Sequence, residues 1–276
     1  MSNQHSAILR LLGDDDASTV ALVEQTLTDT ESLNGLRALR AEATGRAAGR
    51  LDALIRERAT REAESAFLRS CASFGEYGDI EAASWQLAAA FDPIGDFSVQ
   101  RETLDAWGAE VAARLTGTLS RTDRIRVLAD FLGMEMRLRG NDDDYYNIEN
   151  SLLPRVIDTR LGIPISLSLV YILVGRRAGL PIEGVGLPGH FLARHEDVFF
   201  DPFHAGARVG LEECAKLMEQ QNLVLTPQHL IPTTPRQILA RLVTNIHLIA
   251  EQHDPPLAAR TARWLDALRR GVAKRE

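Results

Sequence analysis

An apolar stretch in the middle of the chain is the feature that most restricts its fold. Residues 165–174 are apolar on almost every side of a helix, and a helix without a polar face is buried all round. Pro164 precedes the stretch and Gly179 follows it, with Arg176 and Arg177 in the last turn, which is the typical order at helix ends. The stretch is too short for the roughly 20 residues of a membrane span. It predicts a central helix inside a globular core.

Two short strands are predicted after this helix, over residues 184–194 and 198–203. If the turn between them has two or four residues, Asp201 lies opposite Leu192 and shares a face of the sheet with His190. A turn of three residues would put the two side chains on opposite faces. A buried helix, a histidine strand and an aspartate strand follow one another in papain-like and transglutaminase-like enzymes as nucleophile, base and orienting residue.

The remaining sequence is predicted to be helical. Residues 6–72 have apolar residues at helical spacing and indicate three or four short helices, and residues 80–140 continue as helix. Thr234 and Gln237 have the spacing of a capping box, and residues 254–256 separate two helices of a closing hairpin. We expect a helical layer over residues 1–79, a core over residues 80–232 and a C-terminal helical hairpin over residues 233–276.

The composition limits which kinds of partner the chain can bind and in which cellular compartment it is expected. The 276 residues include 31 Lys and Arg against 38 Asp and Glu, a formal charge of −7, which disfavours nucleic acid as a partner because phosphate binding needs basic surface. The two cysteines, Cys71 and Cys214, are too few for a disulfide scaffold or a cysteine zinc cluster. Neither a signal peptide nor a membrane segment is indicated. We therefore expect a cytoplasmic protein without a membrane partner, and the sequence sets no oligomeric state.

Four motifs carry a resemblance to a known family. They are DDDYY at 142–146, NSLLPRVIDTRLGIPISLSLVY at 150–171, GVGLPGHFLAR at 184–194 and DPFHAG at 201–206. Through them the chain resembles the SirB-type family of bacterial proteins, a branch of the transglutaminase-like superfamily, over roughly residues 80–250. The resemblance implies an α+β, mostly helical fold with a small antiparallel sheet, His190 and Asp201 at the superfamily's histidine and aspartate positions, and a C-terminal hairpin similar to a shortened tetratricopeptide-like extension.

The nucleophile position departs from the superfamily pattern. Enzymes of the superfamily have a cysteine at the start of the central helix, where the helix N-terminus stabilises a thiolate, whereas this chain has Pro164, Ile165 and Ser166. We therefore expect a non-catalytic module that binds a protein or peptide in a cleft near His190. The alternative is an amide or ester hydrolase, or an acyltransferase, in which Ser166, His190 and Asp201 form a triad.

Other candidate sites have weaker patterns. Residues 142–144 are three aspartates without the spacing of a calcium loop, and we expect a solvated loop that leads to Asn150 as a helix cap. His190, Asp201 and His204 are ligand types, but their spacing matches no HxxxH or HExxH motif. We expect no metal and no cofactor. Both cysteines are expected to be small buried apolar residues.

Overall fold

The computed structural model describes residues 3–273 of the chain. The chain forms two compact units, residues 1–66 with 89–95 and residues 67–88 with 96–276. The structure is mostly helical with a small antiparallel sheet, so the predicted α+β class is confirmed. The core and the C-terminal hairpin expected from the sequence both fall within the second unit, and their boundaries as separate domains stay a prediction.

The first unit is a small helical cluster. It contains α1 (Asn3–Leu12), α2 (Ala17–Thr30), α3 (Leu33–Glu42) and the first part of α4 (Gly45–Ser73). Asp16 caps α2 by accepting from the backbone N–H groups of Ser18 and Thr19, and Ser32 caps α3 in the same way. Buried leucines such as Leu36 form its core. The expectation of only short helices is wrong for α4, which runs for 29 residues because no proline interrupts it.

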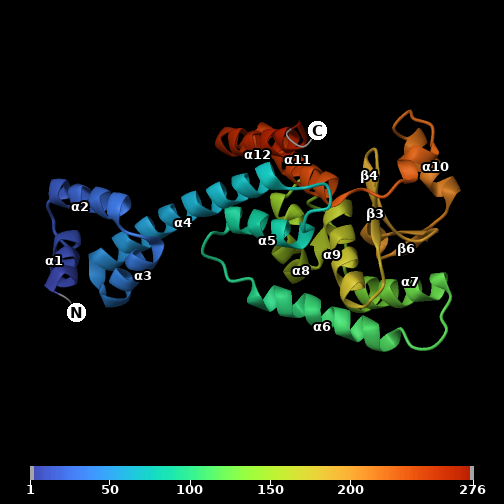
Figure 1. Ribbon diagram of the computed structural model, residues 1–276, viewed down its shortest axis with the longest axis horizontal. Helices are drawn as coiled ribbons and strands as arrows, with labels where there is room; N and C mark the ends of the chain where they lie inside the picture. The colour runs from blue at the N-terminus through green and yellow to red at the C-terminus, as the bar shows by residue number, and fades with distance from the viewer. Residues whose placement is uncertain (1–2, 274–276) are drawn as a thin grey trace. The chain divides into compact units, whose positions relative to one another are not determined.

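The second unit surrounds the central helix α9 (Pro164–Arg177), whose residues 164–175 are all buried, as the sequence predicts. Helices α6 (Ser98–Arg114) and α8 (Leu153–Thr159) contact it, together with two strands of the sheet (Figure 1). The other elements before α9 are α5 (Ile80–Phe91), α7 (Arg121–Ala129), the π-helix η1 (Asp130–Glu135), β1 (Arg139–Gly140), the 3-10 helix η2 (Ile148–Ser151) and β2 (Leu161–Gly162).

The main sheet has four antiparallel strands in the order β3 (Glu183–Leu187), β4 (His190–His195), β5 (Val198–Asp201) and β6 (Ala207–Val209). The single strand predicted over residues 184–194 is wrong, because Pro188 and Gly189 form a tight turn between β3 and β4. Gly189 has φ +74°, a conformation that glycine adopts without steric cost. Strand β6 follows the short helix η3 (Pro202–His204) and was not predicted.

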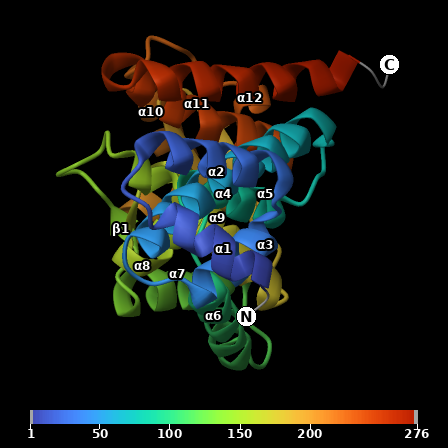
Figure 2. The same cartoon turned by 90° about the vertical axis from the view of Figure 1, so that its left-hand side faces the viewer.

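The C-terminal hairpin is present as expected. Helix α10 (Leu211–Glu219) and the 3-10 helix η4 (Pro227–Leu230) lead to α11 (Pro235–His253) and α12 (Pro255–Ala273), which lie side by side (Figure 2). The predicted capping box is confirmed: Thr234 Oγ1 accepts from the Gln237 N–H at 3.3 Å, and Gln237 Oε1 accepts from the Thr234 N–H at 2.9 Å. Ile238, Leu242 and Ile246 on α11 are buried.

Candidate functional site

His190 and Asp201 form a hydrogen-bonded pair on one face of the sheet. The turn between β4 and β5 contains two residues, and Ala193 pairs with Phe200, which is the register that the sequence argument required. His190 begins β4, Asp201 ends β5, and His190 Nε2 lies 2.8 Å from Asp201 Oδ2. Both side chains are largely buried. The pair predicted from strand parity is confirmed.

Asp201 also holds His204, the second histidine that the sequence analysis grouped with the pair as a ligand type. His204 Nδ1 lies 2.7 Å from the same oxygen, Asp201 Oδ2, and the other carboxylate oxygen accepts from the Phe203 N–H at 2.9 Å. Burial alone would raise the pKa of Asp201, but the hydrogen bonds and charges of His190 and His204 outweigh it and hold the pKa below its ordinary value. Asp201 is therefore a carboxylate shared by two imidazoles.

The sharing depends on the one-turn helix η3. It begins directly after Asp201 and ends at His204, and the residue that follows, Ala205, has φ +55°. This turn brings His204 back over the end of β5 although only two residues separate it from Asp201. The three-position spacing of Asp201 and His204 in a tight turn is the sequence signal for this contact. A search for motifs that assume a regular helix, such as HxxxH, does not find it.

Arg241 of α11 positions His190 from the far end of the chain. Its Nη2 donates to the backbone oxygens of Leu187 at 2.9 Å and His190 at 2.7 Å, on the two sides of the β3–β4 turn. Its guanidinium also lies 5.4 Å from the ring centre of Phe191. Burial lowers the pKa of Arg241. Sequence reasoning missed this residue, whose only signal was an arginine among the apolar residues of a helix predicted to pack on the core.

The structure does not bring Ser166 to the histidine. Its side chain is 1% exposed, and its hydroxyl donates to the Asn150 oxygen at 2.5 Å and accepts from the Ile163 N–H at 3.1 Å. Among the described residues, the partners of Ser166 Oγ are thus the backbone groups of Asn150 and Ile163. Ser166 caps the first turn of α9 and ties it to the preceding loop.

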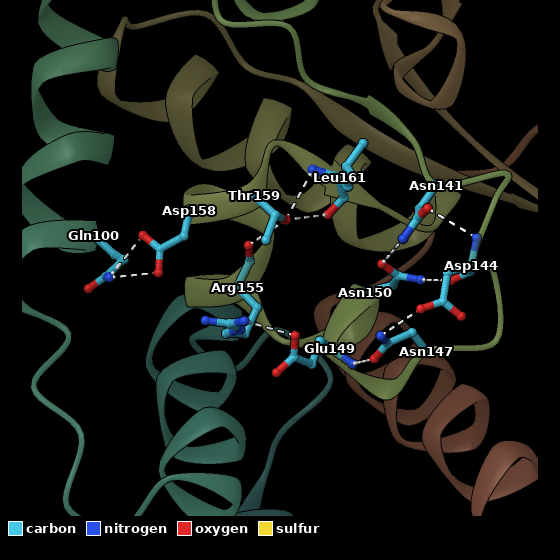
Figure 3. Close-up of polar contacts among 10 residues, drawn as sticks. All are labelled: Gln100, Asn141, Asp144, Asn147, Glu149, Asn150, Arg155, Asp158, Thr159 and Leu161. Carbon is cyan, nitrogen blue, oxygen red and sulfur yellow. Dashed lines mark hydrogen bonds and ion pairs between the residues drawn. The ribbon is translucent and has the colours of Figure 1, made fainter.

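That loop is organised around the buried side chain of Asn150 (Figure 3). Asn150 Nδ2 donates to the backbone oxygens of Asp144 and Tyr145, and Asn150 Oδ1 accepts from Asn141 Nδ2 at 2.9 Å. The expectation that Asn150 caps a helix is wrong, because Asn147 caps η2 by accepting from the Glu149 N–H. Asn150 instead closes the loop on itself.

Neither cysteine has the environment of a nucleophile. Cys71 in α4 and Cys214 in α10 are both fully buried, as expected. Burial raises the pKa of the Cys71 thiol to about 12 and raises that of Cys214 as well. Reactive cysteines have a lowered pKa and some exposure. Both thiols are protonated at neutral pH.

The surface beside His204 is hollowed into a groove that we name the Arg139 groove. One hollow, of about 310 Å³, is lined by Arg139, Asp142, Asp143, Phe203 and His204 among others. A second, of about 460 Å³, shares Arg139, Leu161 and Ala205 with the first and adds Met134, Arg137 and Arg160. His204 lines the first of these hollows, and His190 lines neither of them. The binding cleft expected near His190 stays a prediction.

Two residues of the Arg139 groove have unusual backbone conformations. Arg137 and Arg160 have φ values of +59° and +65°, and non-glycine residues in this region carry a cost of order 1–3 kcal/mol. The π-helix η1 delivers Met134 to the same groove, and π-helical turns are frequent at functional sites. These irregularities gather at one surface of the second unit.

Comparison with known proteins assigns the chain to a superfamily. The family profile described as transglutaminase-like superfamily matches residues 99–244, which include α9, His190 and Asp201. This chain belongs to the transglutaminase-like superfamily. It is 36% identical over 149 residues to a UPF0162 protein of Xylella fastidiosa, a match that covers 50% of each chain. It is 31% identical over 185 residues to a UPF0162 protein of Pseudomonas aeruginosa, covering 65% of this chain and 67% of the relative.

A eukaryotic protein is similar over a shorter region. The match to F-box only protein 21 of Homo sapiens is 32% identical over 124 residues, 41% of this chain and 19% of that protein. The chain spans about half the length of the first curated relatives it matches. No solved structure matches the chain. Within residues 3–273, no helix combines the length and the apolar character needed to span a bilayer.

In this transglutaminase-like domain the described residues include a hydrogen-bonded histidine–aspartate pair, and the Ser166 hydroxyl is bonded to other groups. His190 is held by Asp201 in the manner of a general base. General base catalysis also needs a hydroxyl or thiol within hydrogen-bond reach of the imidazole. Ser166 is bonded elsewhere and both thiols are buried.

Proposed function

We propose that this chain is a non-catalytic transglutaminase-like module of the SirB type that binds a protein or peptide segment in the Arg139 groove. The observation that carries the proposal is the burial and hydrogen bonding of Ser166. The one hydroxyl that the sequence offers as a nucleophile is 1% exposed and donates to the Asn150 oxygen at 2.5 Å. A helix start occupied in this way supports a structural role rather than an acyl-enzyme.

In the serine hydrolase alternative, the Ser166 hydroxyl would have to turn away from its present hydrogen-bond partners, which costs free energy. Ser166 would have to give up its bonds to Asn150 and Ile163, and Asn150 holds the loop from Asn141 to Tyr145 in place. A buried carbonyl left without a donor costs about 1–3 kcal/mol. Gly162 lies so close that a Cβ there would be 2.8 Å from Ser166 Oγ, so the hydroxyl has little room to turn.

The Arg139 groove supports binding through its shape and its charge. Arg137 and Arg139 line it beside Met134, whose side chain is 68% exposed. Arg160 lies over the ring of Trp107 at 4.4 Å and borders the same hollow. Guanidinium groups pair with carboxylates through charge-assisted hydrogen bonds, and an exposed methionine suits an apolar side chain between them. Asp142 and Asp143 line only the first hollow, so the partner that fits the second hollow is a peptide segment with acidic residues next to an apolar one.

A peptide array tests the binding proposal. The full chain is applied to immobilised peptides in which glutamate, lysine and leucine content is varied systematically. We expect binding to the acidic, leucine-containing peptides, weakened about tenfold or more in Arg139→Glu because one attractive pair becomes a repulsive one. The matched control is Arg124→Glu, an exposed arginine of α7 outside the groove.

Two outcomes would contradict the groove as the binding site. One is equal weakening by Arg139→Glu and Arg124→Glu, which would show a general effect of net charge. The other is the absence of any preference for acidic peptides in the unmodified chain. Peptides selected by the array would then be measured in solution by fluorescence anisotropy, at two salt concentrations, since rim charge pairs weaken with salt.

Covalent probes test the non-catalytic half of the proposal. A fluorophosphonate reacts with a serine that a base has activated, and we expect no modification of the native chain. Mass spectrometry decides the outcome. Stoichiometric modification of Ser166 that disappears in His190→Ala would establish the hydrolase alternative and overturn the proposal. Iodoacetamide should modify Cys71 and Cys214 only after unfolding, because both are buried in the folded chain.

A further inference from the structure

A compact cluster of metal-ligand atoms lies at the edge of the Arg139 groove. His190 Nε2, Asp201 Oδ2 and His204 Nδ1 all lie within 4.8 Å of one another. Each histidine is within hydrogen-bond distance of the same carboxylate oxygen, at 2.8 Å and 2.7 Å. The spacing of these residues along the chain fits no metal motif, so the sequence alone predicted no metal. The fold brings the three together through the β4–β5 hairpin and the turn of η3.

We propose that His190, Asp201 and His204 bind one divalent transition-metal ion of the zinc class. Two imidazoles and one carboxylate are the protein ligands of zinc sites that keep a coordination position open. Zinc bonds of about 2.0–2.1 Å place tetrahedral ligand atoms about 3.3 Å apart. The observed separations need to lengthen only slightly for the ion to take the place of the hydrogen-bonded protons. Ligation through these atoms requires each neutral imidazole to carry its one proton on its other ring nitrogen, and the carboxylate to be ionised.

The ligands are already oriented by groups around them. Asp201 Oδ1 accepts from the Phe203 N–H at 2.9 Å, which leaves Oδ2 to face the two imidazoles. Arg241 fixes the backbone of His190 by donating to its oxygen at 2.7 Å. Outer hydrogen bonds of this kind set the orientation of metal ligands and contribute about 10–100-fold to affinity. Two of the three ligands are therefore preorganised on the sheet.

The third ligand provides access and room to adjust. The side chain of His204 is 65% exposed, while those of His190 and Asp201 are 13% and 7% exposed. His204 also lines the groove, so an ion can enter from that side and keep its open position toward solvent. The small movement that metal coordination requires falls on the most exposed of the three side chains.

A buried hydroxyl without a partner lies close to the cluster. Tyr171 in α9 is fully buried, and the structure gives its hydroxyl no hydrogen-bond partner among the described residues. A Cβ added at Gly206 would lie 3.2 Å from that hydroxyl, and the Gly206 N–H donates to the Asp201 oxygen. Unsatisfied buried groups of this kind are typical where a water or an ion is bound.

The donor set also selects among metals. Calcium and magnesium take six or more oxygen ligands, and the cluster has one carboxylate beside two nitrogens. Imidazole ligands suit zinc, copper, nickel and iron, and cobalt reports on the same geometry. The proposal is separate from the binding of an acidic peptide, because the ion needs His190 and Asp201 while the peptide needs Arg137 and Arg139.

Metal titration of the full chain tests the site. We expect calorimetry with Zn²⁺ to show one ion per chain, and Co²⁺ to give the visible absorption of a four-coordinate site with nitrogen and oxygen ligands. His204→Ala should weaken Zn²⁺ binding by at least about tenfold while the metal-free chain still folds cooperatively, because that side chain is mostly exposed. His253→Ala, which removes an exposed histidine at the end of α11, is the matched control and should bind Zn²⁺ as the unmodified chain does.

The result that overturns the proposal is equally concrete. Either the folded chain shows no saturable one-to-one Zn²⁺ binding, or His204→Ala binds Zn²⁺ with unchanged affinity. Arg139→Glu separates this outcome from a failure of peptide binding, since it should weaken peptide binding about tenfold or more and leave the Zn²⁺ titration unchanged. Peptide binding measured with a chelator present completes the separation.

Discussion

Asp201 is the residue on which the geometry of the candidate site depends. It is 5% exposed and accepts from His190, His204 and the Phe203 N–H. We expect Asp201→Ala to lower the free energy of unfolding by about 2–4 kcal/mol, since hydrogen bonds to a charged group contribute about 1.5–3 kcal/mol each and their loss strands buried donors. Ser166→Ala removes neutral bonds to Asn150 and Ile163 and should cost about 1–2 kcal/mol. Urea unfolding of the two variants gives the comparison, and the reverse order would contradict a structural histidine–aspartate pair.

The dependence of stability on acidic pH is the control for assigning the effect of Asp201→Ala to its charged carboxylate. The pKa of Asp201 is lower in the folded chain than its ordinary value of 3.8, so its carboxylate stabilises the fold above that value. This contribution is lost as the pH falls through the folded pKa. The deficit of Asp201→Ala relative to the unmodified chain should therefore shrink below about pH 4, whereas the deficit of Ser166→Ala should not. A deficit of Asp201→Ala that stays constant into acid would assign its effect to lost packing instead.

At the scale of elements, α11 and the β3–β4 turn act together through Arg241. Its guanidinium donates to the oxygens of Leu187 and His190, so Arg241→Met leaves two partly buried carbonyls without this donor. We expect a loss of about 1–3 kcal/mol in unfolding free energy and faster amide hydrogen exchange in β3 and β4. Arg263→Met, an exposed arginine of α12, is the control. Unchanged exchange in β4 after Arg241→Met would refute the positioning role.

The elements also show what the sequence could and could not reveal. The central helix and the facing of His190 and Asp201 were predictable, because both follow from local periodicity and the parity of one short turn. The β3–β4 hairpin was missed because its two strands are joined by only Pro188 and Gly189 within one apolar run. Arg241 lies 51 residues from His190 in the chain, and no local pattern encodes such a contact. The contact between His204 and Asp201 depends on the conformation of the η3 turn, which the sequence pattern does not specify.

At the scale of the whole molecule, the C-terminal helices belong to the same compact unit as the sheet. Besides the bonds of Arg241, further contacts join these helices and the segment before them to the rest of that unit. Thr233 donates its N–H to the Gly184 oxygen at 2.8 Å and accepts from the Gly186 N–H at 2.9 Å, which extends the hydrogen bonding along the edge of β3. Trp264 of α12 packs edge-on against Phe67 with ring centres 4.9 Å apart. A chain without these helices would lose bonds to the sheet as well as apolar cover.

Truncation tests that dependence. Deleting the residues after Pro232 removes Ile238, Leu242 and Ile246, all nearly or fully buried, and exposes the apolar surface that they cover. Large exposed apolar patches promote aggregation, so we expect the truncated chain to lose solubility and cooperative thermal unfolding. In the full chain, Ile246→Ala should cost about 2–5 kcal/mol, whereas Leu248→Ala, at a side chain that is 53% exposed, should cost under about 0.5 kcal/mol. Size-exclusion chromatography and thermal melting decide the matter: a truncated chain that stays monomeric with an unchanged melting temperature would show that the sheet and α9 fold without the C-terminal helices.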